Sequence, residues 1–123
     1  MIAEGMRLAT VGRQPGDALR LGRLDLRFDI NRASWDDKLI DFTIGEFKTI
    51  ALLALRTGEH VSYREIYDLL RGKNFAAGYG DNGYRTNVRS LIKRIRTKFR
   101  TVDPEREHIH NDPGFGYRYD WFT

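Results

Sequence analysis

The stretch that decides the fold is RTNVRSLIKRIRTKFR, residues 85–100. At 100° per residue, its large apolar side chains fall within one narrow sector of a helix, with Leu91 at the edge. They are Val88, Ile92, Ile95 and Phe99. The opposite side carries Thr86, Arg89, Ser90, Lys93, Arg94 and Thr97. The spacing predicts a helix from about residue 84 to about residue 100, with one face in the core and the other basic and hydroxyl-bearing.

The charge of this stretch is as informative as its spacing. It holds seven basic residues and no acidic one, whereas the whole chain has a formal net charge of +4, so the rest of the chain carries −3. Positive charge concentrated on one element is typical of a surface that binds a polyanion. The alternative is an ordinary solvated helix face, which would normally include acidic residues. The absence of acidic residues favours the polyanion.

The composition bounds the class of protein. With 123 residues, 41% hydrophobic and 31% charged, the chain fits one folded domain with a modest core. Glycine, proline and charge interrupt residues 1–18, which we interpret as a linker before a domain over residues 19–123. The absence of cysteine excludes a disulfide scaffold and a thiolate metal site. No long apolar run or signal peptide is visible, so we expect no membrane contact and a cytoplasmic location.

Short strands are predicted before the first helix. From Leu19 onward, Leu24, Leu26 and Phe28 alternate with charged residues, as in a half-buried strand. Two more strands are predicted, from Arg32 to Trp35 and from Lys38 to Phe42, with a turn at Asp36-Asp37. Together they predict an N-terminal antiparallel sheet.

Two capping boxes predict two further helices. Thr43 with Glu46 opens the first, and Ser62 with Glu65 opens the second. Gly58 stands where the first helix would end in a left-handed residue. A glycine-rich loop follows, in which residues 78–83 match G-x-G-x-x-G. A helix precedes that match, whereas a dinucleotide site needs a strand there, so we expect a plain loop.

The C-terminal residues predict a β-hairpin. One strand covers about 107–111, a turn follows at Asp112-Pro113-Gly114, and the second strand extends to about 121. The alternating aromatic residues are expected on its inner face, sealing the core, rather than forming a stacking surface for single strands. They are Phe115, Tyr117, Tyr119 and Trp121. His108 and His110 are expected to be exposed on this hairpin, because two imidazoles without cysteine make a weak metal site.

These elements in this order resemble a known family, the effector domains of OmpR/PhoB-type response regulators. The resemblance covers roughly Leu19 to Tyr119. Its markers are FTIGEF at 42–47, VSYRE at 61–65, Val88 with IKRIR at 92–96, and GFGYRY at 114–119. Residues 78–99 resemble the ChvI-like branch. The resemblance implies an α+β winged helix-turn-helix: an N-terminal antiparallel sheet, three helices and a C-terminal hairpin wing.

The resemblance also implies how such a domain works. The third helix would enter the major groove of DNA, and the wing, about 107–121, would approach the minor groove. The loop over residues 72–83 would face RNA polymerase, and two copies would bind direct repeats. Full-length members carry an N-terminal receiver domain, for which this chain is too short. The sequence departs from the usual pattern of this family at three places. Pro113 stands in place of a basic wing residue, Arg85-Thr86 stands in place of an Asp-Arg pair, and the loop over residues 72–83 is longer.

The candidate DNA-binding residues lie on three elements. On the third helix, Arg89, Lys93 and Arg94 could donate to guanine and Asn87 could read adenine. Thr86 and Ser90 are short enough for close approach, whereas Arg96 and Lys98 lie toward the flanks, where phosphate contact is expected. Ser62, Tyr63 and Arg64 begin the second helix, whose N–H groups suit a phosphate; Tyr63 could equally serve packing. The wing contributes Asn111, Gly114 and Arg118.

The predicted function is therefore sequence-specific binding of double-stranded DNA by the effector domain of a bacterial two-component regulator. No nucleophile with its partners and no metal cluster stands out, so we expect neither an enzyme nor a cofactor. Two alternatives stay open. The basic helix could dock an acidic protein surface, or the domain could bind RNA, which would show as a preference for single-stranded or looped RNA.

Overall fold

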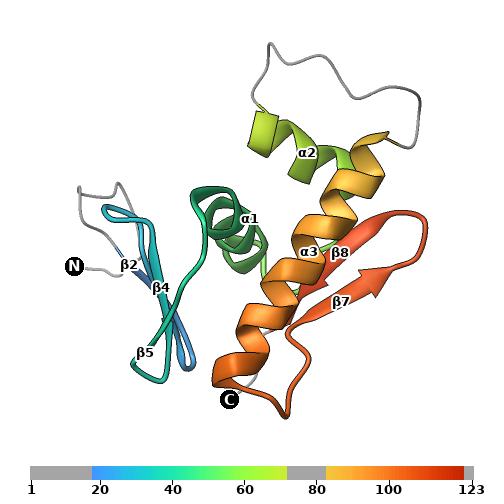
Figure 1. Ribbon diagram of the computed structural model, residues 1–123. Coiled ribbons are helices and arrows are strands. Elements are labelled where there is room, and N and C mark those ends of the chain that lie inside the picture. The colour runs from blue at the N-terminus through green and yellow to red at the C-terminus, as the bar shows by residue number, and fades with distance from the viewer. Residues whose placement is uncertain (1–17, 72–82, 121–123) are drawn as a thin grey trace, which may run out of the picture.

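The computed structural model describes residues 18–71 and 83–120. Their elements, in chain order, are β2 (Ala18–Leu21), β3 (Leu24–Arg27), β4 (Arg32–Trp35), β5 (Lys38–Ile40), α1 (Ile44–Leu55), β6 (Val61–Ser62), α2 (Tyr63–Arg71), α3 (Gly83–Val102), β7 (Ile109–Asp112) and β8 (Gly116–Tyr119). The order confirms the α+β winged helix-turn-helix (Figure 1).

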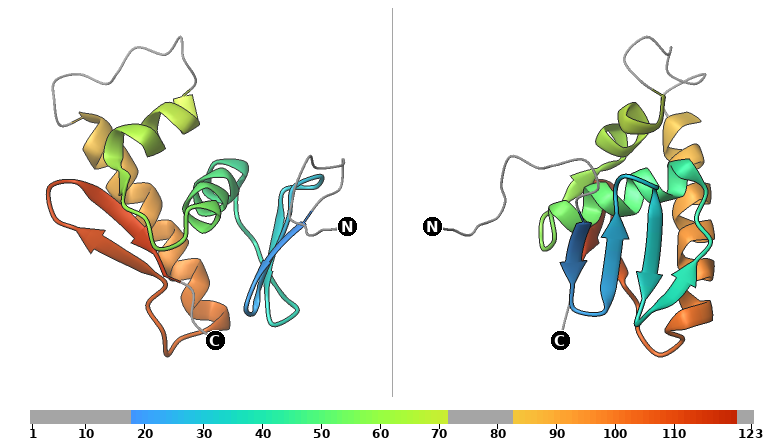
Figure 2. Two further views of the ribbon diagram at one scale, coloured as in Figure 1. Left: turned by 180° about the vertical axis from the view of Figure 1, so that it is seen from behind. Right: turned by 90° about the vertical axis from the view of Figure 1, so that its left-hand side faces the viewer.

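The elements form layers around α1. An antiparallel sheet in the order β2-β3-β4-β5 covers one side of α1, and α3 covers the other (Figures 1 and 2). A second sheet, β6-β8-β7, lies beside α3 and forms the wing. The predicted apolar face of α3 is buried, Leu91 included. The helix is therefore fixed by its core face and keeps its basic face outside.

The N-terminal sheet has one strand more than predicted. β2 pairs antiparallel with β3, and its first residue, Ala18, lies within the predicted linker. The chain reverses at Gly22, which has φ 58°. The turn at Asp36 and Asp37 is confirmed, with φ of 52° and 66°. The last strand ends at Ile40, two residues before its predicted end.

Two expectations for the hairpin were wrong. His108 is buried; its ring stacks on Phe99 at a centroid distance of 4.5 Å, and its Nε2 lies 2.8 Å from Asp103 Oδ2. Burial lowers the pKa of His108, which favours the neutral ring. Phe115, expected inside, is 48% exposed. Tyr117 and Tyr119 are buried as predicted, and Trp121 lies outside the described residues.

Glu46 joins the start of α1 to α3. Its side chain is 1% exposed, yet it is held as an anion. Its Oε1 accepts the Thr43 N–H at 2.9 Å, which completes the predicted capping box, and lies 2.6 Å from Lys98 Nζ. Its Oε2 accepts from Arg94 Nε at 3.3 Å. Burial acts to raise the pKa of Glu46, but the hydrogen bonds from Lys98, Thr43 and Arg94 together lower it below its usual range.

The wing is fastened to the helices by β6, a two-residue strand that the sequence did not reveal. Ser62 of β6 pairs with Gly116 of β8. A Cβ added at Gly116 would lie 2.0 Å from the carbonyl oxygen of Val61, so only glycine fits here.

We expect Gly116→Ala to lower the free energy of unfolding by about 3 kcal/mol, because the methyl group would force β6 and β8 apart. Urea denaturation followed by circular dichroism measures the loss. Gly45→Ala is the matched control: its Cβ would meet only the Leu70 side chain, at 3.4 Å. Equal stability of the two variants would contradict the close approach of β6 to β8.

We expect Glu46→Gln to lower the free energy of unfolding at neutral pH by about 2 kcal/mol, because the buried side chain would lose its charge-assisted hydrogen bonds to Lys98 and Arg94. Since the folded pKa of Glu46 is lowered, its contribution is present above the unfolded value of 4.5 and is lost as pH falls further. The variant should lose less stability on acidification than the wild type. Glu59→Gln, at an exposed pair with Arg56, should change little. Similar losses for both variants would contradict this account.

Candidate nucleic-acid interface

The outer face of α3 holds the largest group of predicted site residues. Six of them lie on it with exposed side chains: Thr86, Asn87, Arg89, Ser90, Lys93 and Arg94. The two flanks of this face differ. Arg94 and Lys98 face α1, where Glu46 receives both, and Arg89 and Arg96 face the wing and the start of α2.

Carboxylates neutralise the C-terminal half of the basic stretch. Arg94 and Lys98 pair with Glu46. Arg96 Nε lies 2.9 Å from a Glu107 carboxylate oxygen, and Arg100 lies 3.8 Å from the same carboxylate. These four cations help to hold the domain together, and Lys98 also donates to the Asp41 carbonyl oxygen at 2.8 Å.

Residues 85–93 of the stretch keep their charge available. Among residues 18–71 and 83–120, no carboxylate pairs with Arg85, Arg89 or Lys93. Arg89 lies over the Tyr63 ring instead, with Cζ 5.3 Å from the centroid. The positive potential of α3 is therefore concentrated in its first three turns.

Arg96 fastens the wing to α3. Its Nη2 donates to the Ile109 carbonyl at 2.8 Å and to Asn111 Oδ1 at 2.7 Å, and its Cζ lies 5.7 Å from the Tyr117 ring centroid. The side chain is 23% exposed. Two predicted contact residues, Arg96 and Asn111, thus bind each other, so a phosphate contact by either one competes with the attachment of the wing.

The start of α2 lies beside this flank. Ser62 and Glu65 form the predicted capping box, with hydrogen bonds of 3.0 Å in both directions. The Tyr63 ring is buried, and its centroid lies 5.4 Å from that of Tyr117. Tyr63 therefore packs the start of α2 against the wing. Arg64 is exposed and donates from Nε to Asp68 Oδ1 at 3.0 Å.

The wing carries little free positive charge. Arg118 lies between Asp120, at 3.0 Å, and Asp112, at 3.6 Å. Gly114 has φ 78° in the turn, and Pro113 and Phe115 form an apolar surface there with His60, which pairs with Asp112. Within the described residues, this wing presents proline and phenylalanine at its tip rather than an unpaired cation.

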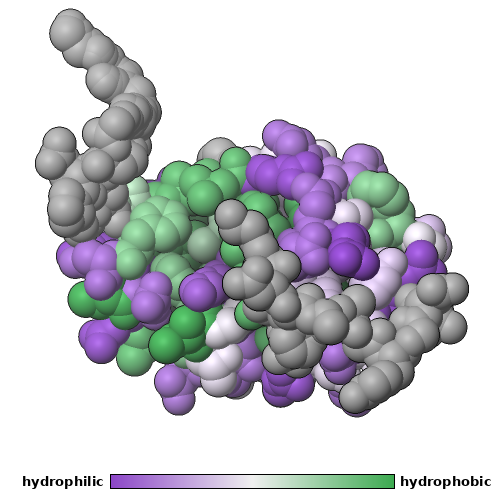
Figure 3. All heavy atoms as spheres, turned by 90° about the horizontal axis from the view of Figure 1, so that it is seen from above, coloured by the Kyte–Doolittle hydropathy of each residue, from purple (hydrophilic) through white to green (hydrophobic). Residues whose placement is uncertain are grey.

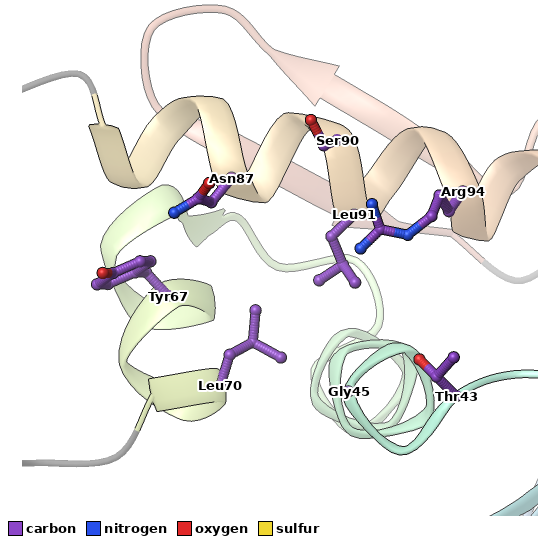
Figure 4. Close-up of a pocket in the computed structure, with 8 residues that line it drawn as sticks. All are labelled: Thr43, Gly45, Tyr67, Leu70, Asn87, Ser90, Leu91 and Arg94. Atoms are coloured by element: carbon purple, nitrogen blue, oxygen red, sulfur yellow. The ribbon is translucent and has the colours of Figure 1, made fainter. Parts of the chain in front are cut away.

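A polar cavity of about 330 Å³ lies on the opposite flank of α3, where the three helices meet (Figure 4). Asn87, Ser90 and Arg94 line it from α3, and Tyr67 of α2 and Thr43, which caps α1, lie across from them. The predicted base-reading residues therefore divide: Asn87 and Arg94 face this cavity, whereas Arg89 lies over Tyr63 at the start of α2.

Hydrophobic and hydrophilic side chains are unevenly distributed over the surface seen from above (Figure 3). Hydrophobic residues gather on the side of the sheet and α1, and hydrophilic residues gather toward α2 and the N-terminal end of α3.

None of the described helices is long and apolar enough to cross a membrane. The loop predicted to face RNA polymerase lies outside the described residues, apart from Gly83.

Two residues near the start of α3, Tyr84 and Arg85, were not among the predicted site residues. Their side chains lie against each other and against α2. The position of Tyr84 directly before the basic stretch was the only sequence feature that could have marked it as a site residue. Its contacts with α2 could not be predicted, because they depend on the fold.

The chain matches known proteins of one kind. The family described as "Transcriptional regulatory protein, C terminal" matches residues 37–119. The transcriptional regulatory protein BaeR of Escherichia coli is 30% identical over 91 residues, which is 72% of this chain and 35% of BaeR. This chain therefore spans about a third of that relative's length.

Solved structures agree with the fold. The DNA-binding domain of CpxR from E. coli superposes with a TM-score of 0.68 at 23% identity, over 85% of this chain and 97% of that one. The DNA-binding domain of Klebsiella pneumoniae RstA, solved in complex with the RstA box, gives 0.67 at 19% identity, over 84% and 96% of the two chains. With the family match and the exposed basic face of α3, these findings identify the chain as a member of the C-terminal domains of transcriptional regulatory proteins, the DNA-binding effector domains of the OmpR/PhoB type.

Proposed function

We propose that this domain reads a specific double-stranded DNA sequence with the first three turns of α3 in the major groove. The observation that supports this most directly is that Arg89 and Lys93 are exposed in those turns and have no carboxylate partner among residues 18–71 and 83–120. Arg89 and Lys93 supply donors suited to guanine O6 and N7. Ser90, one residue after Arg89, is exposed and short, which lets the helix approach the bases.

The paired cations have a different proposed role. Arg94 keeps 58% of its side chain exposed although its Nε is bound to Glu46, so its terminal nitrogens remain available for a base or a phosphate. Arg96 and Lys98 are more enclosed, and we assign them chiefly to holding the wing and α1 against α3. Asn111 belongs to this supporting group through its bond to Arg96, and Arg118 pairs with Asp112 and Asp120 at the wing itself, while Ser62 and Arg64 remain candidates for phosphate contact.

The partners follow the same proposal. The RstA structure contains DNA, which supports duplex DNA as the ligand of this fold. We further propose that the domain acts in the cytoplasm by binding rather than catalysis, that two copies occupy direct repeats, and that residues 72–83 contact RNA polymerase. The resemblance to the ChvI-like branch remains a prediction.

Selection of binding sites from a random duplex library tests the function. We expect enrichment of one short motif, repeated in the same orientation. Binding to single-stranded or looped RNA in preference to duplex would support the RNA alternative, and absence of any enriched duplex motif would exclude specific DNA recognition. Binding to an acidic protein surface that unrelated duplex does not compete for would support the protein-docking alternative.

We expect Lys93→Ala to weaken binding to the selected site by about tenfold, since Lys93 is exposed and unpaired within the described residues. Fluorescence anisotropy over a salt series measures affinity for the selected and a random duplex. A loss confined to the selected duplex indicates base contact, and an equal loss with a flatter salt dependence indicates phosphate contact.

Lys48→Ala is the matched control. Lys48 is likewise an exposed lysine, but it lies on α1 and not on α3. Both variants should keep the circular dichroism spectrum of the wild type. The assignment of the DNA-binding face to α3 would be wrong if Lys48→Ala weakened binding as much as Lys93→Ala.

A further inference from the structure

Arginine and tyrosine side chains gather where the first turns of α2 and α3 meet. Cζ of Arg64, on α2, lies 5.5 Å from the centroid of the Tyr84 ring, and Cζ of Arg85, on α3, lies 5.9 Å from the same centroid. Arg85 also lies over the Tyr63 ring at 5.6 Å. One ring, Tyr84, thus contacts guanidinium groups from both helices of the helix-turn-helix. We call Arg64, Arg85, Tyr63 and Tyr84 the arginine–tyrosine cluster.

The two rings are held in place by the rest of the domain. Tyr63 is 7% exposed and contacts Tyr117 edge-on at 5.4 Å, which anchors it to the wing. Tyr84 is half-buried and packs at 5.7 Å against Tyr67 on α2. Rings fixed in this way can restrict the arginine side chains that lie over them, because a guanidinium group is attracted to an aromatic face.

The two guanidinium groups keep donors available. Arg64 uses Nε for Asp68, and both side chains of that pair are more than half exposed, at 58% and 57%. Arg85 has no carboxylate partner among residues 18–71 and 83–120, and its buried Nε has no hydrogen-bond partner there. A guanidinium group is planar and presents a fork of N–H donors that matches a phosphate.

We propose that the arginine–tyrosine cluster is a preformed site for phosphates of the DNA backbone, in which Tyr84 and Tyr63 are positioning residues. This inference rests on the proposed function. A flexible arginine loses side-chain freedom when it binds a phosphate, and a ring that already restricts it reduces that loss. Since the ligand is the phosphodiester, the cluster increases affinity for any duplex and does not choose the sequence.

Two substitutions at Tyr84 test the positioning role. Tyr84→Phe keeps the ring and should bind selected and random duplexes within about twofold of the wild type. Tyr84→Leu removes the ring and should weaken both by about tenfold, with a flatter dependence of affinity on salt. Equal binding by Tyr84→Leu and the wild type, with equal salt slopes, would overturn the assignment.

Arginine variants test the same site without changing a ring, and so decide the matter even if Tyr84→Leu unfolds. Arg64→Ala and Arg85→Ala should each make the negative slope of log affinity against log salt shallower by about one unit. In a double-mutant cycle, Arg85→Ala should cost less in the Tyr84→Leu protein than in the wild type. An unchanged slope in both arginine variants overturns the phosphate site.

Lys93→Ala separates this inference from the proposed function. If Lys93→Ala weakens duplex binding while Arg64→Ala and Arg85→Ala leave it unchanged, the phosphate site at the arginine–tyrosine cluster is wrong. DNA recognition by α3 would then still stand. A wild type that binds no duplex at all would overturn both proposals.

Discussion

The buried carboxylate of Glu46 is the polar interaction that ties α3 to the start of α1, and the arrangement of the basic face depends on it. It closes the first turn of α1 through Thr43 and receives Arg94 and Lys98 from α3. An isolated anion in this position would be strongly unfavourable, so the two cations are a condition of its burial. Glu46 therefore caps the start of α1, holds α3 against it, and fixes the position of Arg94 on the exposed face.

The helices were predictable because each carries its own signal. The spacing of apolar residues in α3 and the capping boxes at Thr43 and Ser62 all lie within a few residues of the elements they define. β6 could not be found in this way, since two residues are too short to show a period. The burial of His108 depends on Phe99 and Trp35, which reach it from other elements.

The sequence predicted that α3 has an exposed basic face. It did not predict which of the basic residues on that helix pair with carboxylates. The sequence places seven basic residues on α3, and nothing local distinguishes those that meet Glu46 or Glu107 from those that face solvent. The acids that sort them lie on α1 and before β7. Tertiary ion pairs thus separate cations that support the domain from cations that remain available to a ligand.

The attachment of the wing by Arg96 affects the DNA as well as the protein. Because Arg96 binds both Ile109 and Asn111, the hairpin and α3 are coupled and would move together. A domain whose wing is fixed to α3 has little freedom to follow variations in groove spacing, so a duplex that met both elements would have to bend or twist to do so. The energy of that deformation depends on the base steps between the two grooves. Base pairs that no side chain touches would then contribute to the choice of site through their stiffness.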